Sequence, residues 1–368
     1  MNRREFLGGV AALVASGCRS VAGRRSPRYE RVLEAARAQI ADGVVLCAAV
    51  GGSDGDEFVY AGRQGPQADA APIDELTRFD MASITKTITA SVCATLVTDG
   101  LLDPDAPFTE YLPEHVLGKT CEISLRHLAT HSSGFGNFAG WHYVENVAAE
   151  HGAIGYADEL FAKRPVRPLG TYCYSCYNYA LLGTVAERVG GAPLDRLARE
   201  RVLDPLGMSH TGWWPIPDDG HAVTVPLPMH DGKLRRTGEV HDEVARYAGR
   251  PIGNAGMFAT LPDIMRFVTD LLDRRHFPKA HYDLLFTGTF RSGGKCRSFG
   301  FDLSDDGRPV GFSAASIRHT GFTGQLICVD PVLGFAGAVL TLRCPGEKKG
   351  TLGGRNRLLE LCAGCPRT

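Results

Sequence analysis

Residues 80–86 read DMASITK and open a strongly helical run. Ser83 and Lys86 are three residues apart, and residues at that spacing share one face of a helix. We therefore expect the serine hydroxyl and the lysine amine to meet. The positive end of the helix dipole, together with partial burial, is expected to lower the pKa of the amine. A neutral lysine beside a hydroxyl is a base beside a nucleophile, the arrangement that covalent catalysis needs.

A single Ser-x-x-Lys is a weak signal, because it occurs by chance in most chains of this size. The alternative is the ordinary start of an amphipathic helix. The assignment of Ser83 and Lys86 as catalytic residues therefore depends on partners elsewhere in the chain.

The composition excludes several classes of protein. The chain has 368 residues, 44 glycines and a formal net charge of −1. This length allows one large domain or two closely packed ones. The near-zero charge gives no support for nucleic-acid binding. The sequence has neither a glycine-rich phosphate loop after a strand nor an H-E-x-x-H zinc motif, so we expect no cofactor and no metal.

Residues 1–18 are expected to be an export signal. A basic start precedes the apolar run 7–16, which at about ten residues is shorter than the roughly 20 that span a bilayer. The letters RREFL resemble a twin-arginine signal. The letters ASGC, ending at Cys18, resemble a lipobox without its usual leucine, so the alternatives are a lipidated Cys18 and an ordinary cleaved signal. With residues 19–27 as a tether, we expect a periplasmic or membrane-anchored protein.

Eleven cysteines are many for an enzyme of this length. Export would expose them to an oxidising environment, where some could pair. Cys47, Cys93 and Cys328 lie inside apolar runs and are expected in the core. The Cys-x-x-Cys pairs at 173–176 and 362–365 could supply four thiolates to a zinc ion. Because the pairs are far apart in sequence and the first lies inside another motif, we expect no metal site there.

Hydrophobic periodicity and turn residues outline the fold. Helices are expected at 29–40, 81–99, 123–130, 179–189, 194–202, 262–273 and 352–362, and strands at 44–50, 57–62, 299–303, 316–319, 324–329 and 334–342. We predict an α+β fold over residues 28–368, with one mostly antiparallel sheet built from both chain ends and covered by helices. A helical second lobe, approximately residues 100–260, would leave a cleft between the two parts. Loops at 135–170 and 213–250 are expected to border this cleft.

Two polar clusters supply candidate partners for Ser83. Residues 170–179 read GTYCYSCYNY, just before an expected helix. A tyrosine held near two cations can ionise below its usual pKa of about 10 and carry protons. Residues 318–324 read RHTGFTG and close an expected strand, along which a substrate could lie. The alternatives are a tyrosine-rich loop that only packs and a hairpin turn with an incidental histidine.

Taken in order, these motifs resemble the serine β-lactamase and penicillin-binding-protein superfamily. The similarity is closest to its class C β-lactamase-like branch, which includes esterases and D-stereospecific peptidases, and it runs from about residue 30 to residue 343. Beyond Ser-x-x-Lys, it rests on LLDPDAP at 101–107, YLP at 111–113, ISLRHLATHSSG at 123–134, YALLG at 179–183 with Glu187, PLGM at 205–208 and HTG at 319–321.

The resemblance implies a β-lactamase/transpeptidase-like fold and a set of site residues. The family's catalytic, oxyanion and substrate-binding positions fall on Ser83, Lys86, Tyr174, Cys176, His319, Thr320, Gly321 and Phe322. The nucleophile would be Ser83, and backbone N–H groups of Ser83 and Phe322 would form the oxyanion hole, where one donor is worth roughly 3–4 kcal/mol. His127 and His131 match a structural segment and are expected to pack or to fix loops.

The chain departs from the family pattern at Cys176, where the Tyr-x-Asn motif has an asparagine. A thiol is a weak donor and acceptor compared with an amide. Either Asn178 substitutes from a shifted loop or the site works without the amide, which favours a simple ester substrate. A disulfide between Cys173 and Cys176 is a further alternative. His319 in place of the usual lysine weakens the case for a true β-lactamase.

We therefore predict an exported serine hydrolase that acts through an acyl-enzyme on an ester or amide. The substrate would be an ester, a D-amino-acid peptide or a β-lactam, and thus a small molecule or a fragment derived from peptidoglycan. The alternative is a catalytically impaired surface protein that binds a cell-wall peptide in the same cleft, which the departure at Cys176 motivates.

Overall fold

The computed structural model describes residues 26–55, 57–115, 122–137, 165–227 and 236–365. The expected export signal and most of the expected tether lie outside the described residues, as do 138–164 of the first expected loop and 228–235 of the second. Within the described part, no helix is both long enough and apolar enough to cross a membrane.

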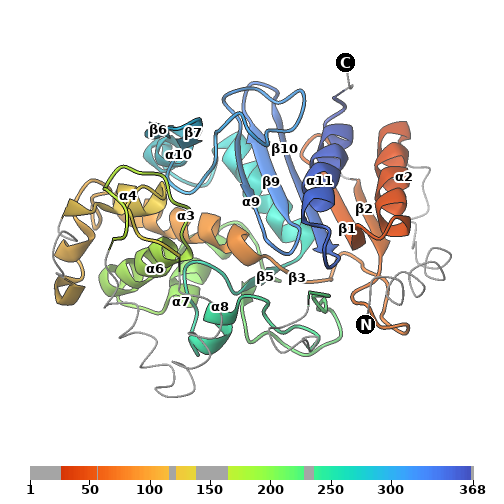
Figure 1. Cartoon of the computed structure of the whole chain (residues 1–368), viewed down its shortest axis with the longest axis horizontal. Coiled ribbons are helices and arrows are strands. Elements are labelled where there is room, and N and C mark those ends of the chain that lie inside the picture. Colours follow the sequence, from red (N-terminus) through yellow and green to blue (C-terminus); the bar gives the residue numbers. More distant parts are fainter. Residues whose placement is uncertain (1–25, 56, 116–121, 138–164, 228–235, 366–368) are drawn as a thin grey trace.

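The chain folds into a sheet flanked by helices, with a group of further helices beside it (Figure 1). The helices are α2 (Pro27–Ala41), α3 (Thr85–Thr98), α4 (Leu125–Ala129), α6 (Cys176–Gly190), α7 (Leu194–Ala198), α8 (Glu243–Tyr247), α9 (Leu261–Asp273), α10 (Lys279–Phe286) and α11 (Lys348–Cys362). The strands are β1 (Val45–Gly52), β2 (Phe58–Gly62), β3 (Phe79–Asp80), β4 (Gly212–Trp213), β5 (Met257–Ala259), β6 (Phe290–Ser292), β7 (Lys295–Arg297), β8 (Ile317–Thr320), β9 (Leu326–Asp330) and β10 (Phe335–Arg343).

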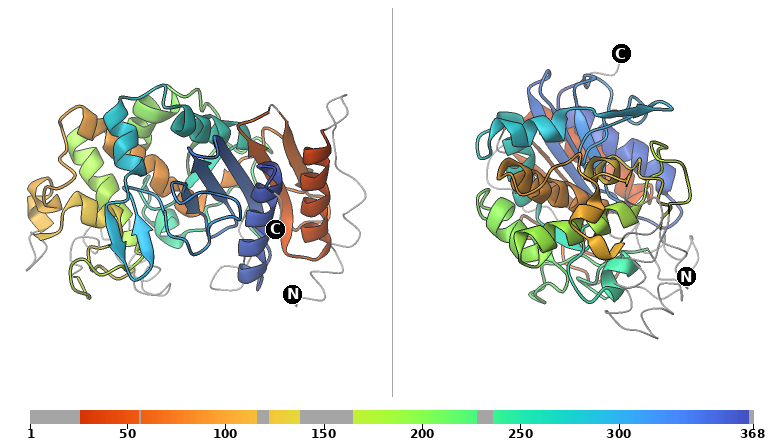
Figure 2. Two further views of the ribbon diagram at one scale, coloured as in Figure 1. Left: turned by 90° about the horizontal axis from the view of Figure 1, so that it is seen from above. Right: turned by 90° about the vertical axis from the view of Figure 1, so that its left-hand side faces the viewer.

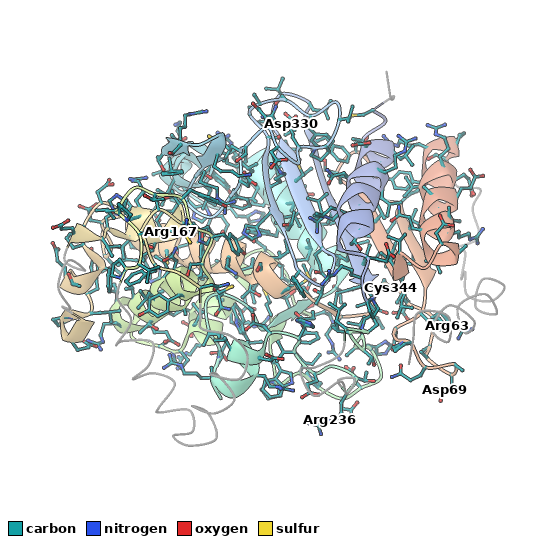
Figure 3. All side chains as sticks on the ribbon, viewed as in Figure 1. Arg63, Asp69, Arg167, Arg236, Asp330 and Cys344 are labelled. Carbon is teal, nitrogen blue, oxygen red and sulfur yellow. The ribbon has the colours of Figure 1, made fainter. Side chains whose placement is uncertain are left out.

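The main sheet joins the two ends of the chain. Its strand order is β2-β1-β10-β9-β8, and every pairing is antiparallel. Figure 3 shows Asp330 and Cys344 at opposite ends of the sheet: Asp330 ends β9 and pairs with the first residue of β10, and Cys344 directly follows β10. The predicted α+β class and the sheet built from both chain ends are therefore confirmed.

Helices cover both faces of this sheet. Helices α2 and α11 pack on one face and α9 on the other, as the views in Figures 1 and 2 show. Every residue of β1, β9 and β10 is buried as a result, which explains why these strands are continuous apolar runs rather than alternating patterns. Cys47 and Cys328 are fully buried in these strands, as predicted, and Cys93 is fully buried in α3.

Helix α3 lies at the centre of the helical part. Its first twelve residues, from Thr85 to Leu96, are all buried, because α6, α7 and α10 pack around it. A helix that is enclosed on all sides presents no polar face to water. This position places Lys86, in its first turn, inside the protein.

The structure differs from the predicted elements in several places. Residues 299–303 form no strand, because Gly300 (φ +107°) turns the chain over α3, where an added Cβ would lie 2.6 Å from Ala90 Cβ. Helix α10 and the β6–β7 hairpin were not predicted, since short elements with mixed polar sequences give little periodic signal. Helix α6 begins three residues before the predicted start, which places Cys176 at its first position.

Gly253 allows the segment before β5 to lie close against two helices beside the site. A Cβ at this position would lie 2.1 Å from the carbonyl oxygen of Tyr179, in α6, and 3.0 Å from Thr89 Cγ2, in α3. We expect Gly253→Ala to lower the free energy of unfolding by at least about 1–3 kcal/mol, because the added methyl group overpacks the contact. Urea denaturation measures this change.

Gly353→Ala is the matched control, because nothing lies within 4 Å of a Cβ at that position in α11. The control should leave stability unchanged or raise it by about 0.5–1 kcal/mol. Equal unfolding midpoints for Gly253→Ala and the unmodified protein would contradict the prediction.

Candidate active site

A tight turn presents Ser83 to solvent. Strand β3 ends at Asp80, and the 3₁₀ helix Ala82–Ile84 leads directly into α3. The buried carboxylate of Asp80 accepts hydrogen bonds from Ala82 N at 2.8 Å and from His241 N at 2.6 Å. Ala82 has φ +44°, a strained conformation for a residue with a side chain. Ser83 is partly exposed, whereas Ala82 and Ile84 are buried.

The predicted contact between Ser83 and Lys86 is present. Lys86 Nζ lies 2.9 Å from Ser83 Oγ and 2.8 Å from the backbone carbonyl oxygen of Asn254, while Cys176 Sγ is 3.5 Å away. The Lys86 side chain is fully buried. Three segments that are distant in sequence therefore fix the amine beside the hydroxyl.

The predicted lowering of the Lys86 pKa is wrong. Burial has the largest single effect and lowers this pKa, but the neighbouring Cys176 and Tyr174 raise it, and the net shift is upward. The physical reason is that the neighbouring phenol and thiol, when ionised, favour the ammonium. The upward shift favours the ammonium form of Lys86, so the proton of Ser83 needs another acceptor.

Tyr174 is the nearest phenol to this cation. Its ring centroid lies 5.3 Å from Lys86 Nζ, and its side chain is 37% exposed, so a bound substrate could reach it. The buried ring of His131 packs against Tyr174 with centroids 4.3 Å apart, and its Nδ1 accepts a hydrogen bond from Ser175 N at 3.2 Å. His131 thus fixes the loop that carries Tyr174, which agrees with the structural role expected for it.

His319 is buried and neutral. Its Nδ1 lies 3.1 Å from the carbonyl oxygen of Thr320, which can only accept, so Nδ1 carries the proton. Burial, followed by the charges of Arg297 and Lys86, holds the pKa of His319 well below 6.5. His319 therefore adds no positive charge beside Lys86. The catalytic role of His319 remains a prediction.

The third motif docks against the nucleophile turn. Thr323 Oγ1 donates to the carbonyl oxygen of Asp80 at 3.0 Å, and a Cβ at Gly321 would lie 2.9 Å from the carbonyl oxygen of Met81. The segments that carry Ser83 and Phe322 are therefore neighbours, as an oxyanion hole between their N–H groups would need. The side chain of Thr320 is partly exposed beside them.

The aromatic ring of Phe322 lies directly after the third motif, residues 319–321. It is 48% exposed and has the ring of His241 at 5.2 Å and the guanidinium of Arg343 at 4.2 Å, both measured to its centroid. Contacts with both groups hold the ring in place.

Cys176 occupies the position of the family's amide, and Asn178 does not replace it. The Asn178 oxygen accepts a hydrogen bond from Ser133 Oγ at 2.7 Å, and its nitrogen lies 3.3 Å from His131 Nδ1. The alternative in which Asn178 substitutes from a shifted loop is thus wrong. Cys173 and Cys176 are free thiols rather than a disulfide, and burial raises the pKa of the Cys176 thiol.

Two further expectations concern histidines and metals. His127 completes the N-terminal capping of α4, since its Nδ1 accepts from Ser124 N at 3.1 Å, which agrees with a structural role. Among the residues that the structure describes, no group of three or more His, Cys, Asp or Glu side chains could hold a metal ion.

Sequence reasoning missed Asn254, whose backbone carbonyl binds the lysine. Any residue can supply a backbone carbonyl, so no side-chain pattern could have identified this position. The contact arises only because the segment before β5 folds back over the first turn of α3.

Buried histidines should make the fold sensitive to acid. Burial is the main cause that holds the pKa of His131 and His319 well below 6.5 and lowers the pKa of His281 to about 4. The unfolded chain binds these protons near pH 6.5, so the free energy of unfolding should be unaffected above that pH and fall below it. For His281 alone, the loss should approach about 3 kcal/mol near pH 4.

Urea midpoints measured from about pH 7.5 to about pH 5 test this expectation. His281→Phe is the informative variant, because the His281 ring already stacks on Phe277 at 4.3 Å. It should flatten the pH dependence, and an identical slope in the variant would contradict the assignment.

Comparisons with known proteins agree with this geometry. The family model described as Beta-lactamase matches residues 32–361. The chain is 29% identical over 297 residues to a putative D-alanyl-D-alanine carboxypeptidase of Escherichia coli (strain K12), covering 70% of this chain and 67% of that protein. It is 28% identical over 328 residues to Esterase EstB of Burkholderia gladioli, covering 77% of this chain and 83% of the esterase.

Solved structures show the same fold. A class C β-lactamase superposes with a TM-score of 0.74 at 17% identity, covering 93% of this chain and 98% of that one. The D-alanine carboxypeptidase AmpC of Burkholderia cenocepacia superposes with a TM-score of 0.70 at 20% identity, covering 90% of this chain and 99% of that one.

Proposed function

Because the chain belongs to the β-lactamase family of serine hydrolases, we propose that it cleaves a carboxylic ester through an acyl-enzyme on Ser83. One observation carries this proposal. A partly exposed serine hydroxyl lies 2.9 Å from a fully buried ammonium, which a backbone carbonyl holds in place at 2.8 Å. This arrangement orients a nucleophile without blocking it.

The residues divide the proposed reaction between them. Ser83 Oγ attacks the carbonyl carbon and gives its proton to Tyr174, which reacts as a phenolate whose negative charge the Lys86 ammonium stabilises. Backbone N–H groups of Ser83 and Phe322 would bind the developing oxyanion. Tyr174 then returns the proton to the departing alcohol oxygen. A water molecule attacks the acyl-serine by the same route and releases the carboxylic acid.

Cys176 supports an ester rather than an amide substrate. The family's amide would bind a substrate carbonyl, and a neutral thiol in its place makes only weak hydrogen bonds. An alcohol also leaves more readily than an amine, so an ester makes smaller demands on the site. The esterase relative points the same way. A D-alanyl peptide is the second candidate, because other relatives are described as putative D-alanyl-D-alanine carboxypeptidases.

Export is part of the proposal. The basic start, the apolar run 7–16 and Cys18 support a periplasmic or membrane-anchored location. In that compartment, esters and peptidoglycan-derived peptides would both be accessible to the enzyme.

Labelling combined with a substrate panel tests the proposal. The protein is treated with a fluorescent fluorophosphonate and with a fluorescent penicillin. It is then assayed on p-nitrophenyl esters, a D-alanyl-D-alanine peptide and a chromogenic cephalosporin. We expect labelling at Ser83 and fastest turnover of the esters. Labelling without turnover would favour the impaired binding protein, and neither labelling nor turnover would overturn the assignment as a hydrolase.

A further inference from the structure

Asn254 is a buried polar residue whose side chain has no evident structural partner. The residue is 0% exposed, and neither Oδ1 nor Nδ2 makes a hydrogen bond of good geometry to a described residue, although the side chain lies close enough to the Cys176 thiol to lower the pKa of that thiol. Leaving a buried amide unsatisfied costs roughly 1–3 kcal/mol. Such a group in a native fold calls for an explanation.

The position of Asn254 points to the active site. Its own backbone carbonyl oxygen accepts a hydrogen bond from Lys86 Nζ at 2.8 Å. The Asn254 side chain belongs to the same residue and therefore starts close to the ammonium. Burial is the main cause that raises the pKa of the Cys176 thiol, and the Asn254 amide is among the nearby groups that lower it. The Asn254 amide, the thiol and the ammonium therefore lie together.

The ammonium needs a further acceptor during the reaction. Its three N–H groups face Ser83 Oγ, the Asn254 carbonyl and the Cys176 sulfur, which is a poor acceptor. Once Ser83 is acylated, its oxygen becomes an ester oxygen and accepts weakly. A neighbouring amide oxygen would then stabilise the ammonium better than the thiol does.

We propose that the side-chain amide of Asn254 replaces, in this chain, the amide that Cys176 lacks. Asn254 is a positioning residue for Lys86. This inference rests on the proposed function. It assigns to Asn254 a role that the family places at the third residue of its Tyr-x-Asn motif.

The test is a double-mutant cycle between Asn254 and Cys176, assayed on a p-nitrophenyl ester. Asn254→Ala should lower kcat by about 10- to 100-fold, the effect of losing one hydrogen bond to a charged group, with little change in KM. Cys176→Asn alone should change kcat by less than about threefold, because an amide already serves the site. In the C176N background, Asn254→Ala should lose far less activity, since the two amides substitute for each other.

Three results of the double-mutant cycle would contradict the inference. A kcat loss of the same size in both backgrounds would show that Asn254 acts only through packing, and an unchanged kcat in Asn254→Ala would show that it does not act at all. A gain above about tenfold in Cys176→Asn alone would show that the site lacks an amide. Each of these outcomes overturns the inference.

Two controls separate the inference from folding and from the proposed function. Ser91, in α3, is another buried residue whose side chain makes no hydrogen bond to the described residues, and Ser91→Ala should leave kcat unchanged. If Asn254→Ala fails to fold by circular dichroism, the cycle is repeated with Asn254→Ser, for which an intermediate kcat in the Cys176 background and rescue by C176N are expected. Absence of labelling and turnover in the unmodified protein would instead count against the proposed function.

Discussion

Ser83→Ala is expected to abolish turnover of a p-nitrophenyl ester, with kcat/KM falling by about 10⁴-fold or more, as for other catalytic serines. The substitution removes the one atom that would form the acyl bond. It leaves the turn intact, because the contacts of Asp80 with Ala82 and His241 do not involve the serine side chain. The free energy of unfolding should change by only about 1 kcal/mol, the value of one hydrogen bond.

Steady-state assays and fluorophosphonate labelling measure this effect together. Ser91→Ala, a serine substitution in the helix α3 that follows the Ser83 turn, is the matched control and should retain both activity and label. If Ser83→Ala kept the turnover of the unmodified protein, the nucleophile would have to be another residue, and the proposed chemistry would fail.

The pairing of Ser83 with Lys86 could be predicted from sequence because it is a local property. Residues three apart on one helix face meet whatever the rest of the chain does. The strands β1, β9 and β10 could be predicted for a similar reason, since helices on both faces leave a continuous apolar run. The predicted strand at 299–303 failed because Gly300, close to Ala90, turns the chain there.

The electrostatics of the site could not be predicted, because they depend on contacts between distant segments. The upward shift of the Lys86 pKa depends on Cys176 and Tyr174, which lie about 90 residues away along the chain. The neutral state of His319 follows from its burial and from the charge of Arg297. A prediction from the helix spacing and the helix dipole alone therefore gave the wrong direction for the shift of the Lys86 pKa.

Lys86→Met is expected to lower kcat/KM by about 10²–10⁴-fold, the usual contribution of a group that assists proton transfer. Methionine is of similar length but carries no charge, so negative charge on Tyr174 loses its neighbouring cation. Stability should not fall greatly, because a charge is removed from a fully buried position and replacing such a charge with an apolar side chain is often neutral. Urea denaturation and ester kinetics measure the two effects separately.

The rate of fluorophosphonate labelling shows at which step Lys86 acts. Labelling requires Ser83 to lose its proton but does not require hydrolysis of an acyl group. If the lysine cation assists activation of Ser83, the labelling rate of Lys86→Met should fall in parallel with kcat/KM. A normal labelling rate with slow turnover would confine Lys86 to deacylation. Retention of more than about a tenth of the activity would contradict a role for the cation in either step, and Lys86 would then serve only to hold Ser83 and the segment of Asn254 together.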